Sequence, residues 1–128
     1  MGEIPFSITN KTNGKLTRLP FERIKERILG KKYSLSLVFI GNTRSQTLNR
    51  KYRKKNTPAN VLAFPLSKTS GEIFINLNRA ERESKQFDMS KRVFVGYLFI
   101  HALLHLKGRR HGSKMKSEER KMRTVFNL

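Results

Sequence analysis

All three histidines of this chain lie in one 11-residue window, at positions 101, 105 and 111. His101 and His105 are spaced i, i+4, which places both rings on one face of a helix. Gly108 allows the chain to turn back, so that His111 can approach the same point. Three neutral imidazoles in this arrangement are typical of an open zinc site with a fourth position for water. We therefore predict one Zn²⁺ per chain, bound by His101, His105 and His111.

The residue between the two helical histidines argues against a zinc peptidase. The metalloprotease helix motif is His-Glu-x-x-His, in which the glutamate is the general base. Ala102 occupies that position here. A peptidase mechanism would therefore lack its base.

The charge of the chain indicates a polyanionic partner. The sequence has 28 Lys and Arg against 9 Asp and Glu, for a formal net charge of +19. A field of this size attracts nucleic acid, although a solvated basic surface or a lysine-biased proteome would give the same composition. The longest basic cluster is 50–55, interrupted by Tyr52. There is no cysteine, which excludes a disulfide framework and a cysteine nucleophile.

The periodicity of apolar residues predicts an α+β fold in a single domain, residues 1–128. A mixed sheet of about four strands packs with about five helices, and a central helix carries two of the histidines. The expected strands are 4–9, 33–40, 61–66 and 72–77, and the expected helices are 20–30, 43–54, 78–86, 91–107 and 116–126. Leu48 with Tyr52 is the expected buried pair of the second helix, and Met122, Val125 and Phe126 are expected to face inward in the last.

The chain lacks an apparent targeting or membrane segment. Residues 1–10 do not read as a signal peptide, and the apolar stretch 93–106 is too short to span a bilayer. We therefore expect a cytoplasmic protein without membrane contact.

Two blocks of the sequence resemble the YbeY family of rRNA maturation endoribonucleases. The family pattern His-Gly-x-Leu-His-Leu-x-Gly-Tyr-Asp-His corresponds without a gap to residues 101–111, HALLHLKGRRH. The pattern Leu-Asn-x-x-Tyr-Arg-x-Lys-Asp-x-Pro-Thr-Asp-Val-Leu-Ser-Phe-Pro corresponds to residues 48–65, LNRKYRKKNTPANVLAFP. The strand at 71–75, GEIFI, is also similar to the family's Gly-Asp-Ile-x-Ile.

The resemblance implies zinc-dependent cleavage of single-stranded RNA. It implies a role in rRNA processing at the 3′ end of the small-subunit RNA, in ribosome quality control, and in contact with the small ribosomal subunit or its proteins. The functional arginine of the family corresponds to Arg53. This chain departs from the family at its acids, because Asn56, Asn60 and Arg110 stand where the family has aspartate.

We assign roles on this basis. Arg53 and His111 are the expected catalytic residues, and Arg53 would hold the phosphate through its planar guanidinium. Residues expected to contact RNA are Lys51, Lys54, Lys55, Arg109 and Arg110. Phe64 and Phe74 could stack on bases but are expected in the core. The alternative is a non-catalytic RNA-binding or ribosome-assembly protein with structural zinc, although three ligands favour an open catalytic site.

Overall fold

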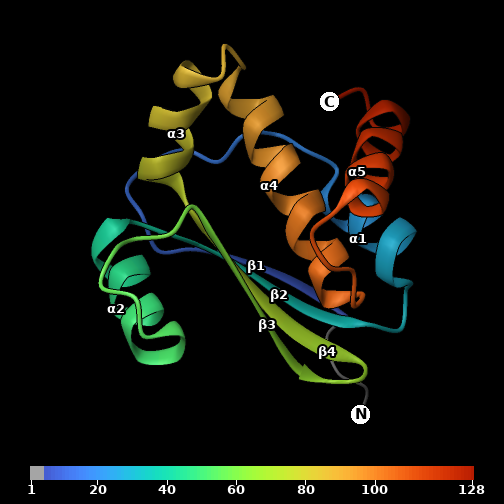
Figure 1. Ribbon diagram of the computed structural model, residues 1–128, viewed down its shortest axis with the longest axis horizontal. Coiled ribbons are helices and arrows are strands. Elements are labelled where there is room, and N and C mark those ends of the chain that lie inside the picture. The colour runs from blue at the N-terminus through green and yellow to red at the C-terminus, as the bar shows by residue number, and fades with distance from the viewer. Residues whose placement is uncertain (1–4) are drawn as a thin grey trace.

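The strands form one mixed sheet in the order β1-β2-β4-β3. In the computed structural model, which describes residues 5–128, β1 (Phe6–Asn10), β2 (Ser34–Ile40) and β4 (Ser70–Asn76) are parallel neighbours (Figure 1). β3 (Val61–Ser67) pairs with β4 antiparallel, at the edge of the sheet. The edge position suits Pro65, which has no N–H to donate. The first strand was predicted from Ile4, which lies outside the described residues.

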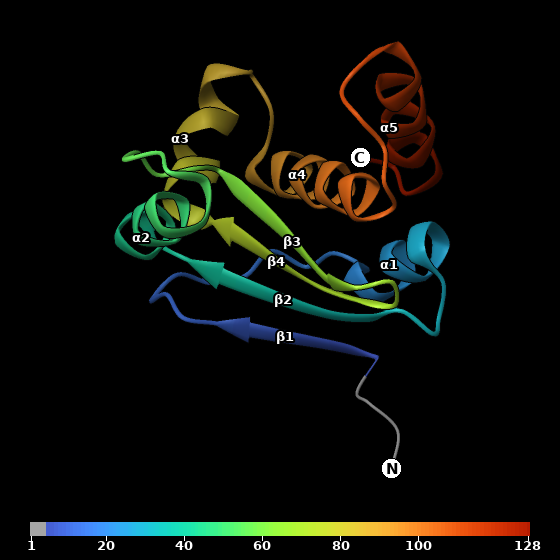
Figure 2. The ribbon, with the colours of Figure 1, turned by 60° about the horizontal axis from the view of Figure 1, so that its bottom comes forward.

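The helices are α1 (Phe21–Leu29), α2 (Asn42–Arg53), α3 (Leu77–Gln86), α4 (Lys91–Leu106) and α5 (Ser113–Val125). α4 lies over the sheet, and α1, α3 and α5 pack around it (Figure 2). α2 lies apart from them, where β2 ends. This arrangement confirms the predicted α+β fold. Within residues 5–128, no helix has both the length and the apolar character that crossing a membrane requires.

α4 is the central helix of the core, as predicted. Ser90 caps its N-terminus by accepting a hydrogen bond from the Val93 N–H at 3.1 Å. Its apolar residues are buried on several sides, and Phe99 packs edge-to-face on Phe21 with ring centroids 5.1 Å apart. A helix packed on this scale is a rigid base for the two histidines in its last turns.

α2 differs from the prediction in what it buries. Tyr52 is 57% exposed, so the proposed Leu48–Tyr52 buried pair is wrong. Ser45 and Asn49 are buried instead, and they hold the following loop by hydrogen bonds to the Ala59 and Thr57 carbonyls, both at 2.8 Å. The helix is fixed by polar contacts that an apolar pattern does not detect.

α5 agrees with the prediction at Met122 and Phe126, which pack against the core, and differs from it at Val125. It begins at Ser113, three residues before the expected start, and Val125 is 49% exposed. Its buried residues are Met115 and Glu119. A buried carboxylate facing α4 is costly without a partner, and its partner lies in the histidine cluster.

Candidate metal centre and its surroundings

The three histidines meet at the C-terminal end of α4, as predicted. His101 and His105 project from consecutive turns, and Gly108, with φ of +96°, reverses the chain so that His111 returns to them. The ring centroids of His105 lie 4.6 Å from those of both His101 and His111. One possible ligand atom from each residue lies within 4.8 Å of the other two.

The donor set fits a zinc ion. The Nε2 atoms of His101 and His105 are 3.1 Å apart, and two imidazole nitrogens on one tetrahedral zinc are separated by roughly 3.3 Å. Two nitrogen lone pairs facing each other would repel, whereas a cation between them is bound by both. The site is made entirely of imidazole nitrogen, which zinc accepts readily.

Glu119 completes this centre, and the sequence reasoning did not find it. Its buried carboxylate lies 2.5 Å from Nδ1 of His101. A carboxylate accepts hydrogen bonds, so Nδ1 carries the proton and Nε2 presents its lone pair to the metal position. The sequence feature that could have predicted this contact is a glutamate on the inward face of α5, between Met115 and Met122.

Glu119→Gln is expected to lower zinc affinity by about 10- to 100-fold. A glutamine amide no longer provides the charge that orients and polarises the His101 ring. Competition with a chelating indicator measures the affinity. Glu118→Gln is the matched control, because Glu118 contacts Arg109 and not a histidine. Equal losses in the two variants would contradict a specific role for Glu119.

His105 is held in the neutral form that binds metal. Burial lowers its pKa from the ordinary value, and the neighbouring His101 and His111 lower it further. A hydrogen bond with the Arg109 backbone acts in the opposite direction. Tyr97, one turn before His101, has its pKa raised by burial and by the charge of Glu119. Both groups are therefore uncharged near neutral pH.

Arg53 lies at the same cavity as the histidines. The cavity has a volume of about 380 Å³ and is lined by Arg53, Val61, Ala63, His101, Ala102, His105 and His111. Nη2 of Arg53 donates to the Ala63 carbonyl on β3 at 2.9 Å. This bond holds the guanidinium, at the end of α2, at the cavity that the three histidines also line, and the catalytic role of Arg53 stays a prediction.

Aromatic rings extend from Arg53 across the outer side of the sheet. The guanidinium carbon lies 5.4 Å from the Phe64 ring centroid, and Phe64 contacts both Tyr52 and Phe74. Phe64 and Phe74 are half-buried and do not belong to the buried core, contrary to expectation. The exposed Tyr52 ring, with Lys51 Nζ 5.3 Å from its centroid, forms the open end of this row.

The other predicted RNA contacts lie outside the metal cavity. Lys51, Lys54 and Lys55 are exposed at the end of α2, and Arg110 is exposed in the loop before His111. Arg109 binds Glu118 at 2.6 Å and lines a separate cavity between α1, α4 and α5. Its predicted contact with RNA stays a prediction.

Asn60, which replaces a family aspartate, has a defined partner here. Its Nδ2 donates to Glu83 on α3 at 3.0 Å, and Arg79 binds the other carboxylate oxygen of Glu83 at 2.8 Å. An aspartate at position 60 would place two carboxylates face to face. The amide at this position is therefore matched to Glu83.

Asn60→Asp is expected to destabilise the fold by about 1–2 kcal/mol, because a hydrogen-bond donor to a charged group becomes a like charge. Urea unfolding measures this change. The double variant Asn60→Asp with Glu83→Gln should be about 1 kcal/mol more stable than the sum of the two single-variant effects predicts. Strict additivity would show that the two side chains do not interact.

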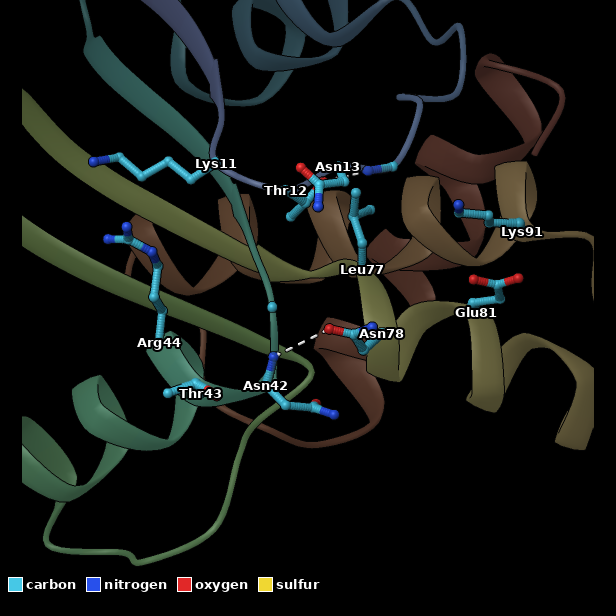
Figure 3. A pocket seen from close by; sticks show the side chains of 12 residues that line it. Lys11, Thr12, Asn13, Asn42, Thr43, Arg44, Leu77, Asn78, Glu81 and Lys91 are labelled. Atoms are coloured by element: carbon cyan, nitrogen blue, oxygen red, sulfur yellow. Dashed lines mark hydrogen bonds between the residues drawn. The ribbon is translucent and has the colours of Figure 1, made fainter.

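A cavity of about 480 Å³ lies away from the histidines, near the ends of β1, β2 and β4 (Figure 3). Figure 3 shows Lys11 and Arg44 on one side of it and Lys91 and Glu81 on the other. The Asn42 N–H donates to Asn78 Oδ1 at 3.2 Å. Its lining is a mixture of amides and of both signs of charge.

Comparisons with known proteins place the chain in one family. The family profile for Endoribonuclease YbeY matches residues 6–126. The Endoribonuclease YbeY of Pelotomaculum thermopropionicum is 31% identical over 127 residues, covering 91% of this chain and 82% of the relative. That of Alkaliphilus metalliredigens is 32% identical, covering 75% of this chain and 69% of the relative.

A solved structure shares the fold. The solution structure of TM1509 from Thermotoga maritima aligns with a TM-score of 0.65 over 91% of this chain and 85% of that protein, at 22% identity. The family profile covers both the Arg53 segment and the histidine cluster, whose geometry is described above. This chain therefore belongs to the endoribonuclease YbeY family.

Proposed function

We propose that the protein is a zinc-dependent endoribonuclease that cleaves single-stranded RNA. The observation that carries this proposal is the convergence of His101, His105, His111 and Arg53 on one cavity. The family and the net charge of +19 support RNA as the substrate. Its place would be rRNA maturation in the cytoplasm, at the 3′ end of the small-subunit RNA and in ribosome quality control, with the small ribosomal subunit as its partner.

Each group at the cavity has a separate role in the proposed reaction. A zinc ion held by the three imidazoles would act as a Lewis acid for the phosphate and lower the pKa of a water molecule. Glu119 keeps the proton on His101 Nδ1. Arg53 directs its remaining N–H groups at the phosphate oxygens, where negative charge develops during attack. The open side of the histidine cluster favours this catalytic role over a structural zinc site.

The aromatic row beside Arg53 supports a preference for single strands. Tyr52 and Phe64 offer ring faces next to the guanidinium, and unpaired bases stack on such rings. Bases in a duplex are stacked on each other and do not present their faces. An unpaired base on Tyr52 would place its neighbouring phosphate near Arg53.

Metal removal tests the proposed activity. The substrate is a 5′-labelled single-stranded fragment of the small-subunit rRNA 3′ end, beside the same fragment annealed to its complement. Cleavage by zinc-loaded protein should fall by about 100-fold or more after chelator treatment and return when zinc is restored. The duplex should be cut at least about tenfold more slowly than the single strand.

His105→Ala, purified in parallel, controls for a contaminating nuclease. It should show no metal-restored cleavage. Equal cleavage by this variant, or cleavage that the chelator does not affect, would contradict the proposal. Binding of RNA without any cleavage would favour the non-catalytic alternative.

A further inference from the structure

A second cavity lies on the other side of the loop that carries His111. It has a volume of about 630 Å³ and is formed by α1, the end of α4, the following loop and α5. Its apolar lining is Ile28, Leu104 and Met122. Its polar lining is Arg27, Lys107, Arg109, Lys114, Ser117, Glu118 and Lys121.

The lining of this cavity is far more basic than the protein as a whole. Lys and Arg are 28 of 128 residues in the chain but five of the ten that line the cavity. Its one acid, Glu118, is bound to Arg109 at 2.6 Å. Within residues 5–128, no ion pair joins Arg27, Lys107, Lys114 or Lys121 to an acid. A surface that is merely solvated gives no reason for this concentration of charge around a hollow.

The cavity also differs from the one in Figure 3 in its balance of groups. There, three cations are mixed with neutral amides, and Glu81 faces Lys91. Here, cations surround a partly apolar surface in which Ile28 and Leu104 are buried. Cations around an apolar surface suit a ligand with phosphate groups and carbon-rich sugars or bases.

The loop between α4 and α5 connects this cavity to the metal centre. Arg109 lies in the basic cavity, and His111, two residues later, lies in the zinc cavity. α5 is likewise shared, because Glu118 faces the basic cavity and Glu119 binds His101. The two cavities therefore border the same loop and the same helix.

We propose that the cavity formed by α1, α4 and α5 is a second phosphate-binding site, which holds the RNA chain beyond the metal centre. The identity of the ligand as RNA rests on the proposed function, whereas phosphate recognition rests on the cations themselves. The site would strengthen the binding of long RNA more than that of short oligonucleotides, which cannot fill both cavities at once.

The test is a binding measurement that does not require cleavage. The affinity of the full chain for labelled single-stranded RNA of 5 and 20 nucleotides is measured across a salt series, with a chelator present. The site variant is Lys114→Glu with Lys121→Glu, since both residues are exposed on α5. The control is Arg82→Glu with Lys85→Glu, which changes the net charge equally on the exposed face of α3, on the opposite side of α4 (Figure 1).

The site variant should bind the 20-nucleotide RNA at least about tenfold more weakly than the control variant. Its salt slope should fall by about 1.4, the value for two lost phosphate contacts on a single strand. The difference between the two variants should be smaller on the 5-nucleotide RNA, which cannot fill both cavities at once. Equal losses on the long RNA would overturn the proposal, because net charge would then explain them.

A free nucleotide carries the same phosphate, sugar and base groups as RNA and is the other ligand that this cavity would suit. ADP and inorganic pyrophosphate are therefore titrated calorimetrically into wild type and the site variant. Stoichiometric binding of ADP that the site variant loses, with unchanged RNA affinity, would overturn RNA as the occupant. If the wild type cleaved no RNA, the proposed activity would be contradicted. The binding results would still show whether the basic cavity holds RNA.

Discussion

His111→Ala is expected to lower zinc affinity by on the order of 100- to 1000-fold, because one of three protein ligands is lost. Cleavage at limiting zinc should fall in proportion. His111 is exposed in the loop between α4 and α5 and does not belong to the buried core. The free energy of unfolding of the metal-free protein should therefore change by less than about 1 kcal/mol.

Three measurements on the same protein check this result: zinc affinity by chelator competition, urea unfolding, and cleavage of labelled single-stranded RNA. Lys116→Ala, at an exposed position on α5 that lines neither the histidine cavity nor the basic cavity, is the control and should retain zinc affinity. An unfolded His111→Ala protein would show that the zinc is structural and would favour the non-catalytic alternative. A folded variant with unchanged zinc affinity would remove His111 from the ligand set.

Arg53→Ala is expected to reduce kcat by about 100- to 1000-fold, with little change in KM. The guanidinium is held at the histidine cavity by its bond to the Ala63 carbonyl and by the Phe64 ring beneath it. Its charge acts most strongly on the phosphate oxygens as they gain negative charge. Arg53→Lys should recover only part of the rate, because an ammonium cannot reproduce the planar set of donors.

Lys54→Ala is the matched control for Arg53. Lys54 follows directly in the chain, is exposed, and does not line the zinc cavity. It should weaken RNA binding a few-fold through KM and leave kcat unchanged. If Arg53→Ala behaved in the same way, Arg53 would contribute to the attraction of RNA and not to the chemical step.

The departures from the family acids have a structural reason at one position. Asn60 donates to Glu83, so restoring the family aspartate there would introduce repulsion unless Glu83 also changed. Arg110 is exposed and forms no ion pair among residues 5–128, so aspartate could be introduced there without loss of such a pair. Of the two, Arg110 is the more direct site for testing whether an acid beside His111 raises activity.

The spacing of residues along the chain was enough to identify the cluster of three histidines and the helix that carries two of them. His101 and His105 are neighbours because a helix repeats every 3.6 residues, and Gly108 allows the reversal that brings back His111. These are local relations, and local geometry depends on spacing alone. The same holds for most strands and helices, whose apolar periodicity follows from which side faces the core.

The groups that reach the histidines from distant parts of the chain depend on how the helices pack. Glu119 is 18 residues from His101 in the chain and reaches it because α5 packs on α4. Arg109 lies in the same motif as His111 but turns into the other cavity, where Glu118 binds it. Tyr52 is exposed because hydrogen bonds from Ser45 and Asn49, not apolar contacts, fix how α2 sits. Contacts of this kind depend on how whole elements pack, and the spacing of residues along one element carries no information about them.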